Sequence, residues 1–73
     1  MDKMIKVGVI GYGYWGPNLV RNLADISTCC LIGVADVNRQ RLDHIRGLYP
    51  QLGVTQDYRE LFELGLDAVV IAP

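Results

Sequence analysis

A short apolar run followed at once by three spaced glycines constrains this chain more than any other feature. The run covers residues 7–10, and Gly11, Gly13 and Gly16 follow it with the spacing Gly-x-Gly-x-x-Gly. In such a segment the first glycine permits a tight turn out of a strand, the second lets the backbone approach a ligand closely, and the third lets a helix pack against the strand. The spacing therefore predicts a strand, a glycine loop and a helix.

The apolar residues of the whole chain alternate between short continuous runs and helical spacing. This alternation is typical of strands and helices that surround a parallel sheet. The continuous runs predict four strands, at residues 4–10, 29–35, 53–55 and 67–72. We expect the third to be a short edge strand.

Two helices are predicted between the first three strands. Pro17 suits the first turn of the first helix, which should end near Asp25. Asn38 can cap the second helix, and Pro50 prevents it from continuing. The buried stripe of the second helix is expected to consist of Leu42, Ile45 and Leu48.

A third helix is predicted before the last strand. Asp57 and Glu60 have the spacing of a capping box, in which each side chain accepts from a main-chain N–H at the helix start. Gly65 suits the end of the helix. The buried face is expected to consist of Tyr58, Leu61, Phe62 and Leu64.

The order of the strands follows from the handedness of their connections. Right-handed crossovers place the first three strands side by side in one direction, and the fourth then pairs on the other side of the first. The sequence therefore predicts an α/β fold, a half-Rossmann βαβαβαβ unit whose parallel sheet has the order 3-2-1-4 and is truncated after its fourth strand. In this topology the glycine loop and residues 72–73 meet at one crevice.

The glycine loop and one acidic residue together indicate a dinucleotide site. Main-chain N–H groups near Tyr14, Trp15 and Gly16 are expected to face a pyrophosphate at the start of the helix. Asp36 ends the second apolar run, 20 residues after Gly16, where an acid can accept hydrogen bonds from the adenosine ribose hydroxyls. The alternatives are a purely structural glycine turn and a plain turn or capping role for Asp36.

Asp36 also favours NAD over NADP. A ribose 2′-phosphate beside it would place like charges about 4 Å apart, at a cost of roughly 1–4 kcal/mol. Arg39 provides the counterargument, because it could pair with a 2′-phosphate, although a solvated position in the first helical turn is the preferred interpretation. The aromatic residues Tyr12, Tyr14 and Trp15 are expected either to shape the pocket wall or to pack against neighbouring loops or a further domain.

Composition excludes several other classes of partner. The 73 residues are 51% hydrophobic and 21% charged, with a formal net charge of −1, so one small core is expected and no basic surface for nucleic acid or anionic lipid. No apolar run approaches the ~20 residues of a membrane span. Carboxylates and the single His44 form no ligand or acid-base cluster, so neither a metal site nor a catalytic residue is predicted.

Cys29 and Cys30 are adjacent and lack the spacing of a metal or redox motif. Buried free thiols are therefore expected, and with them a reducing, cytoplasmic location. His44 is expected on the solvated face of the second helix, far from the glycine loop.

With these residues in view, the segments VGVIGYGYWGPNLVRNL, VADVNRQRL and DAVVIAP resemble the start of the Gfo/Idh/MocA oxidoreductases, the family of glucose-fructose oxidoreductase and inositol dehydrogenase. The resemblance implies an NAD(P)-dependent oxidation of a sugar, cyclitol or nucleotide-sugar hydroxyl by hydride transfer to the nicotinamide. It assigns the phosphate loop to the three glycines and the ribose acid to Asp36. Ala72 and Pro73 look like the start of the family's Ala-Thr-Pro turn, without the Thr.

Members of the family continue into a Glu-Lys-Pro segment with a catalytic Lys and then into a substrate domain. Neither occurs within residues 1–73. The resemblance therefore implies a partial dinucleotide-binding domain without a substrate domain. Such a fragment is expected to bind NAD(P) without being catalytically competent alone. Whether the chain acts as an enzyme is left open.

A different class of function is a self-assembling or nucleotide-binding module that has no catalytic role. In either class the free edge of the fourth strand is expected to pair with a second copy and form a homodimer. A methyltransferase is a weaker alternative, because its glycine loop usually carries an acid at the end of the first strand, where this chain has Val9 and Ile10.

Overall fold

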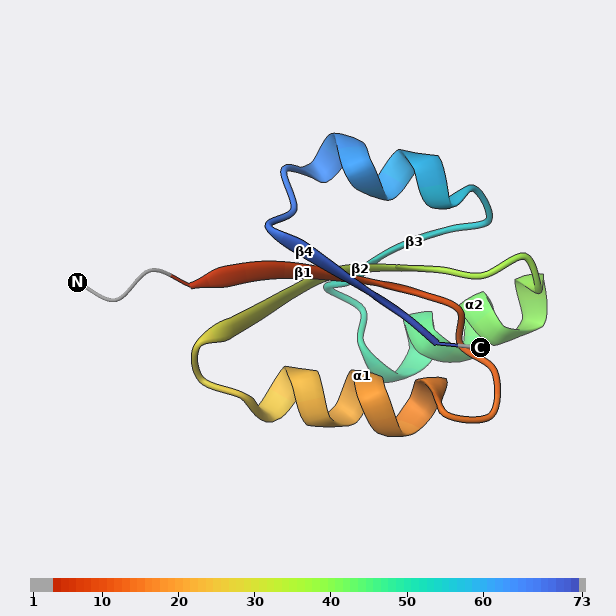
Figure 1. Cartoon of the computed structure of the whole chain (residues 1–73). Helices are drawn as coiled ribbons and strands as arrows, with labels where there is room; N and C mark the ends of the chain where they lie inside the picture. The colour runs from red at the N-terminus through yellow and green to blue at the C-terminus, as the bar shows by residue number, and fades with distance from the viewer. Residues whose placement is uncertain (1–3, 73) are drawn as a thin grey trace.

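A computed structural model describes residues 4–72 and confirms the predicted fold class. One parallel sheet has the strand order β3-β2-β1-β4. The elements along the chain are β1 (Ile5–Ile10), α1 (Gly16–Asp25), β2 (Cys29–Ala35), α2 (Arg39–Leu48), β3 (Gly53–Thr55), the 3-10 helix η1 (Tyr58–Leu64) and β4 (Ala68–Ile71). In Figure 1 α1 and α2 cover one face of the sheet, and η1 covers the other.

The strand register places the carboxyl ends of β1, β2 and β4 at the same edge of the sheet. Ile10 pairs with Ala35 of β2 on one side and with Ile71 of β4 on the other. The Gly11 N–H donates to the Ala35 carbonyl at 2.7 Å, and the Ala72 N–H donates to the Ile10 carbonyl at 2.8 Å. These main-chain bonds extend the pairing one residue beyond the strands and fix where the glycine loop begins.

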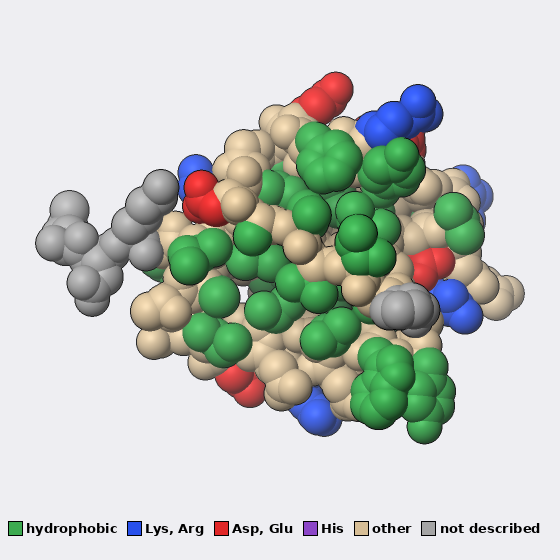
Figure 2. Space-filling view, viewed as in Figure 1, with side chains coloured by type: hydrophobic (Ala, Val, Ile, Leu, Met, Phe, Trp, Pro, Cys, Tyr) green, Lys and Arg blue, Asp and Glu red, His purple; other side chains and the backbone are tan. Residues whose placement is uncertain are grey.

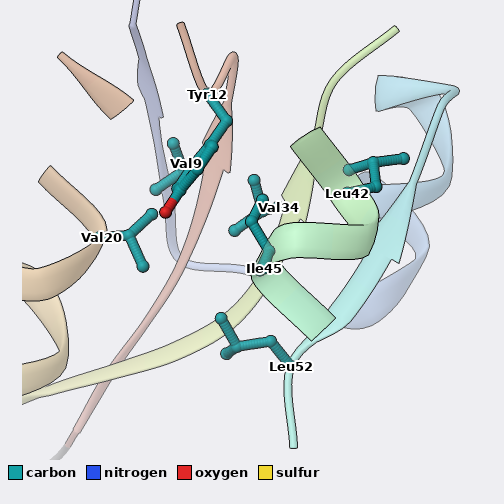
Figure 3. Packing of buried hydrophobic residues seen from close by; sticks show 7 residues of the cluster. All are labelled: Val9, Tyr12, Val20, Val34, Leu42, Ile45 and Leu52. Atoms are coloured by element: carbon teal, nitrogen blue, oxygen red, sulfur yellow. The ribbon is translucent and has the colours of Figure 1, made fainter. Parts of the chain in front are cut away.

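The main core lies between the sheet and the helices α1 and α2. Val9 and Val34 from the sheet meet Val20 from α1 and Ile45 from α2, and all four are fully buried. The seven core residues drawn in Figure 3 are Val9, Tyr12, Val20, Val34, Leu42, Ile45 and Leu52.

On the opposite face of the sheet the side-chain layer is reduced, because two glycines lie side by side there. Gly8 of β1 pairs with Gly33 of β2. A Cβ on Gly33 would lie 3.0 Å from Leu61, and a Cβ on Gly8 would lie 2.6 Å from Leu66. The missing side chains therefore let η1 and the segment after it approach the sheet closely, and Leu61 is buried beneath η1.

The α2 stripe differs from the sequence prediction at its last residue. Leu42 and Ile45 are buried, whereas Leu48 is 56% exposed. Three-residue steps rotate by about 300° around an α-helix, so two such steps carry Leu48 about 120° away from Leu42. Tyr49 is seven residues after Leu42, returns to the same face, and packs against the core.

The third helix also differs from its prediction, because it is a 3-10 helix rather than an α-helix. Only Leu61 of the four expected core residues is buried. Tyr58, Phe62 and Leu64 are about half exposed. The four-stranded sheet is narrow, and its edge strand β3 has three residues, so it offers too little surface to cover the whole helix.

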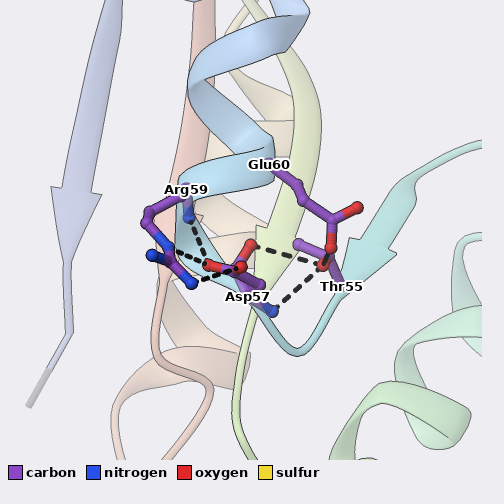
Figure 4. A network of polar contacts seen from close by, with 4 residues as sticks. All are labelled: Thr55, Asp57, Arg59 and Glu60. Carbon is purple, nitrogen blue, oxygen red and sulfur yellow. Dashed lines mark hydrogen bonds and ion pairs between the residues drawn. The ribbon is translucent and has the colours of Figure 1, made fainter.

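The start of η1 is held by a polar network, shown in Figure 4, that only partly matches a capping box. The Asp57 carboxylate accepts from the Arg59 N–H at 3.0 Å, as predicted for the cap. Glu60 does not reach the Asp57 N–H. That N–H donates to Thr55 Oγ1, and the Thr55 hydroxyl donates to Glu60 at 2.6 Å. Hydrogen bonds from the Arg59 side chain and backbone also lower the pKa of the Asp57 carboxyl.

At Gly11 both the backbone conformation and the space around the residue exclude a side chain. Its φ is +97°, and a Cβ there would collide with the Ala72 carbonyl oxygen. We predict that Gly11→Ala lowers the free energy of unfolding by about 3 kcal/mol or more, since the backbone strain and the overpacked contact each cost about 1–3 kcal/mol. Urea unfolding followed by circular dichroism measures the change.

Gly47→Ala is the matched control. Gly47 lies in α2 with nothing within 4 Å of an added Cβ. We expect this variant to gain about 0.5–1 kcal/mol from helix propensity. Equal destabilisation by the two substitutions would contradict the special role of Gly11.

Candidate functional site

A pocket of about 240 Å³ opens at the edge of the sheet where β1, β2 and β4 end. Gly11 and Gly13 line it from the loop after β1, Asp36 from the end of β2, and Ala72 from the end of β4. The remaining lining residues are Ile10, Ala35, Val37, Arg41, Gln56 and Tyr58. The topology thus brings together the glycine loop, the acid and the residue after β4, as the sequence predicted.

Asp36 is the only buried charged residue in the described part of the chain, with 7% of its surface exposed. Its Oδ2 accepts from the Tyr12 N–H at 2.7 Å, and its Oδ1 accepts from the Asn38 N–H at 2.7 Å. Tyr12 belongs to the glycine loop and Asn38 caps α2 through hydrogen bonds from the N–H groups of Gln40 and Arg41. The carboxylate therefore joins the loop after β1 to the start of α2.

One basic residue of the site was missed by the sequence analysis. Arg41 NH1 lies 3.6 Å from Asp36 Oδ2, and the Arg41 side chain is 49% exposed. Arg39, which the sequence analysis selected, lies instead along a neighbouring hollow with Asp43 and Arg46. The signal was available: Asn38 as N-cap makes Arg41 the third helical residue, and helical side chains lean back toward the helix start.

The three aromatic residues of the loop have different environments. Tyr12 is buried in the core, and a Cβ on Gly16 would lie 3.2 Å from its ring. Burial raises the pKa of Tyr12. Tyr14 and Trp15 are 84% and 57% exposed, pack edge to face on each other with ring centroids 5.2 Å apart, and do not line the pocket.

The prediction that His44 lies far from the glycine loop was wrong. His44 is exposed, but its ring centroid is 6.5 Å from that of Tyr12. α2 packs beneath the loop residue Tyr12, because both contribute to the same core cluster.

The start of α1 has a distinctive arrangement of main-chain groups. Trp15 occupies the N-cap position, where its indole offers no acceptor, and no side chain caps the helix. The Gly16 N–H is already used, since it donates to the Gly13 carbonyl at 3.2 Å. The positive end of α1 thus has no side-chain acceptor of its own, which leaves it accessible to an anion.

Several other predictions concern groups outside the pocket. Cys29 and Cys30 are free, but they are half-buried rather than fully buried. Among residues 4–72, no group of three or more His, Cys, Asp or Glu side chains could hold a metal ion. No helix in this part of the chain is long and apolar enough to cross a membrane. Pro73, a predicted site residue, lies outside the described residues.

Comparisons with known proteins place this geometry among dehydrogenases. No protein-family model and no curated protein sequence matches the chain. A scyllo-inositol dehydrogenase from Lactobacillus casei matches 100% of the chain with a TM-score of 0.87 and 27% identity. The same enzyme with bound NAD(H) and scyllo-inositol matches 97% of it, with a TM-score of 0.85 and 27% identity. A probable dehydrogenase from Thermotoga maritima matches 93%, with a TM-score of 0.83 and 30% identity.

The structural neighbours are Gfo/Idh/MocA-type oxidoreductases. This finding confirms the resemblance read from the glycine loop, the acid after the second strand and the apolar fourth strand. The chain spans about a fifth of the length of these Gfo/Idh/MocA-type proteins, covering 22% of the Lactobacillus casei enzyme and 21% of the Thermotoga maritima protein.

The Asp36 carboxylate is expected to stabilise the fold in addition to any role in ligand binding. We predict that Asp36→Ala lowers the free energy of unfolding by about 2–6 kcal/mol, because two main-chain N–H groups lose their acceptor at about 1–3 kcal/mol each. Asp43→Ala, which removes an exposed acid from α2, should change it by less than about 0.5 kcal/mol. Urea unfolding compares the two variants, and equal effects would contradict the structural role of Asp36.

Proposed function

We propose that residues 1–73 form a partial dinucleotide-binding domain that binds the ADP half of NAD. The buried Asp36 carboxylate carries this proposal, because it lines the same pocket as Gly11 and Gly13 and is held in place by the loop itself. The Lactobacillus casei relative, which holds NAD(H) in its structure, supports the choice of a nicotinamide dinucleotide.

The carboxylate has acceptor capacity left for a ribose. An ionised carboxylate offers about four lone-pair sites on two oxygens. One main-chain N–H occupies one site on each oxygen of Asp36. Each oxygen can therefore accept a further hydrogen bond from a ribose hydroxyl on the pocket side. The same negative charge favours NAD over NADP, as the sequence analysis argued.

The pyrophosphate is proposed to lie against Gly13 and the start of α1. A glycine presents no Cβ to a phosphate at this position, and the helix start supplies the positive end of its dipole. The proposed cofactor-binding residues are Gly11, Gly13, Tyr14, Trp15, Gly16, Asp36, Arg39, Ala72 and Pro73. Tyr14, Trp15, Gly16 and Arg39 do not line the pocket. For the first three the proposal rests on their place at the start of α1, and for Arg39 it rests on side-chain movement.

The wider reaction is proposed by analogy with the inositol dehydrogenases. In the complete protein, the bound dinucleotide would accept a hydride from the carbon that carries a hydroxyl of a sugar, cyclitol or nucleotide-sugar. Residues 1–73 would contribute cofactor binding and not the catalytic groups. Lys6 is the lysine within the described residues. It lies in the first half of β1, where it pairs with Cys30 of β2, and so it is away from the end of the strand that leads into the glycine loop. The free cysteines support a reducing, cytoplasmic location.

Calorimetric titration tests the cofactor proposal. We expect NAD and ADP-ribose to bind the chain with similar affinity, and S-adenosylmethionine to give no heat of binding. Gly13→Val should abolish binding of both NAD and ADP-ribose by placing a side chain against the pyrophosphate that they share, whereas Gly47→Ala should leave the binding of both unchanged. Absence of heat with NAD and ADP-ribose would overturn the proposal, and heat with S-adenosylmethionine alone would favour a methyltransferase.

We also propose that two copies pair through the outer edge of β4. β4 bonds to β1 on one side only, and Ile71 is 70% exposed. Figure 2 shows hydrophobic side chains gathered along β4 and over η1; the exposed apolar residues there are Tyr58, Phe62, Leu64, Val69 and Ile71. An open apolar strand edge is a template for pairing with another strand. Such a module could assemble without any catalytic role.

Light scattering coupled to size exclusion tests the dimer. We expect a dimer mass at micromolar concentration and a monomer mass for Ile71→Lys, because the lysine places charge on the pairing surface. Leu48→Lys is the matched control: Leu48 is also exposed and apolar, but it lies on α2. A monomer mass for the unsubstituted chain at high micromolar concentration would contradict the proposal.

A further inference from the structure

We propose that Tyr12 is the positioning residue of the glycine loop: its main-chain N–H holds the loop to Asp36, and its buried ring supports the loop where α1 begins. The inference rests on the proposed function and deepens it, because it names the residue that keeps the segment proposed to bind the pyrophosphate in one conformation. The glycine spacing itself leaves position 12 unspecified.

The main chain of Tyr12 is fixed at the point where the loop leaves β1. Its N–H donates to Asp36 Oδ2 at 2.7 Å, in a buried contact. The preceding N–H, that of Gly11, donates to the Ala35 carbonyl, also at 2.7 Å. Two consecutive N–H groups therefore bind the last residue of β2 and the residue after it, so the protein itself holds the entry to the loop.

The Tyr12 side chain leaves the loop and enters the main core. It is buried and belongs to the same cluster as Val9, Val20 and Ile45. Figure 3 shows the ring extending from the loop after β1 toward Val20 of α1. The ring of His44, on α2, lies with its centroid 6.5 Å from that of Tyr12. A residue of the glycine loop is therefore anchored in a core to which β1, α1 and α2 all contribute.

The far end of the loop packs on the same ring. A Cβ on Gly16, the first residue of α1, would lie 3.2 Å from Cγ and Cδ1 of Tyr12. This distance is shorter than an ordinary contact, so the glycine main chain packs directly against the ring. The Gly16 N–H also donates to the carbonyl of Gly13, which lines the pocket. Tyr12 thus holds both the entry of the loop and its end.

These contacts matter for a ligand because a loop that is already ordered binds more tightly than a loop that becomes ordered on binding. Ordering the loop at the moment of binding would remove conformational entropy and weaken the affinity. Tyr12 does not line the pocket, so it acts through the loop and not by touching the ligand. The other two aromatic residues of the loop, Tyr14 and Trp15, have exposed side chains that are not part of the core.

Leu52 provides a matched comparison in the same core. It is buried in the cluster that contains Tyr12, but it precedes β3 and does not line the pocket. Leu52→Ala therefore removes buried apolar contacts without changing the glycine loop. If Tyr12 only filled the core, folded Tyr12 and Leu52 variants would bind a ligand equally well. If Tyr12 positions the loop, only its own substitution weakens binding.

Calorimetric titration of ADP-ribose into the full chain tests this role, under conditions in which urea unfolding shows each variant to be folded. We expect Tyr12→Phe to bind within about threefold of the original chain, because the ring stays against Gly16. Tyr12→Leu keeps an apolar core side chain but loses the planar ring, and should weaken binding by about tenfold. Leu52→Ala should lower the stability and yet change the affinity by less than about threefold.

Amide hydrogen exchange gives a second readout that does not depend on a ligand. In Tyr12→Leu we expect the N–H groups of residues 12 and 16 to exchange about tenfold faster relative to those of β1 and β2, because the loop opens locally more often. Leu52→Ala should instead accelerate exchange at the loop and at the strands together, because it lowers the global stability.

Equal weakening of ADP-ribose binding by Tyr12→Leu and Leu52→Ala would overturn the inference while leaving the proposed function intact. The same holds for unchanged exchange at residues 12 and 16 in Tyr12→Leu, and for lost binding in Tyr12→Phe, which keeps the ring. Failure of the original chain to bind ADP-ribose would overturn the proposed function, and the exchange measurement would then decide by itself whether Tyr12 holds the loop.

Discussion

The Asp36 carboxylate is the contact on which the site and its surroundings depend. A buried charge is costly unless hydrogen bonds satisfy it. Here two main-chain N–H groups do so, one from the loop after β1 and one from the cap of α2. The Asp36 side chain therefore fixes the separation between the loop after β1 and the start of α2. Asp36 also lines the pocket, so the residue proposed to bind a ribose is the residue that holds the loop in position.

This contact is possible because β1 and β2 are parallel neighbours that end at the same level. The pairing of Ile10 with Ala35 places the next residue of each strand at one edge of the sheet. Gly11 then turns through a positive φ directly against Ala72. Parallel pairing, the positive φ of Gly11 and the buried acid support one another, which explains why residues from distant parts of a short chain line one pocket.

The glycine spacing, the strand runs and the acid after the second strand were sufficient to predict the topology and the main pocket residues. The sequence analysis was less accurate where burial depended on how much surface a neighbour offers. It expected four buried residues on the third helix, and only Leu61 is buried, because the sheet beneath is narrow. It also expected Leu48 to belong to the buried face of α2. The rotation of the helix turns Leu48 toward solvent, and Tyr49 packs against the core instead.

The sequence by itself determined the order of strands and helices, because apolar periodicity, caps and glycines act over a few residues. It also determined that Asp36 stands at a strand end. Only the tertiary structure decided that Arg41 rather than Arg39 faces this acid, that Tyr12 belongs to the core, and that His44 lies near the loop. These outcomes depend on how α2 is rotated and packed against the sheet, and that rotation is set by contacts between residues far apart in the chain.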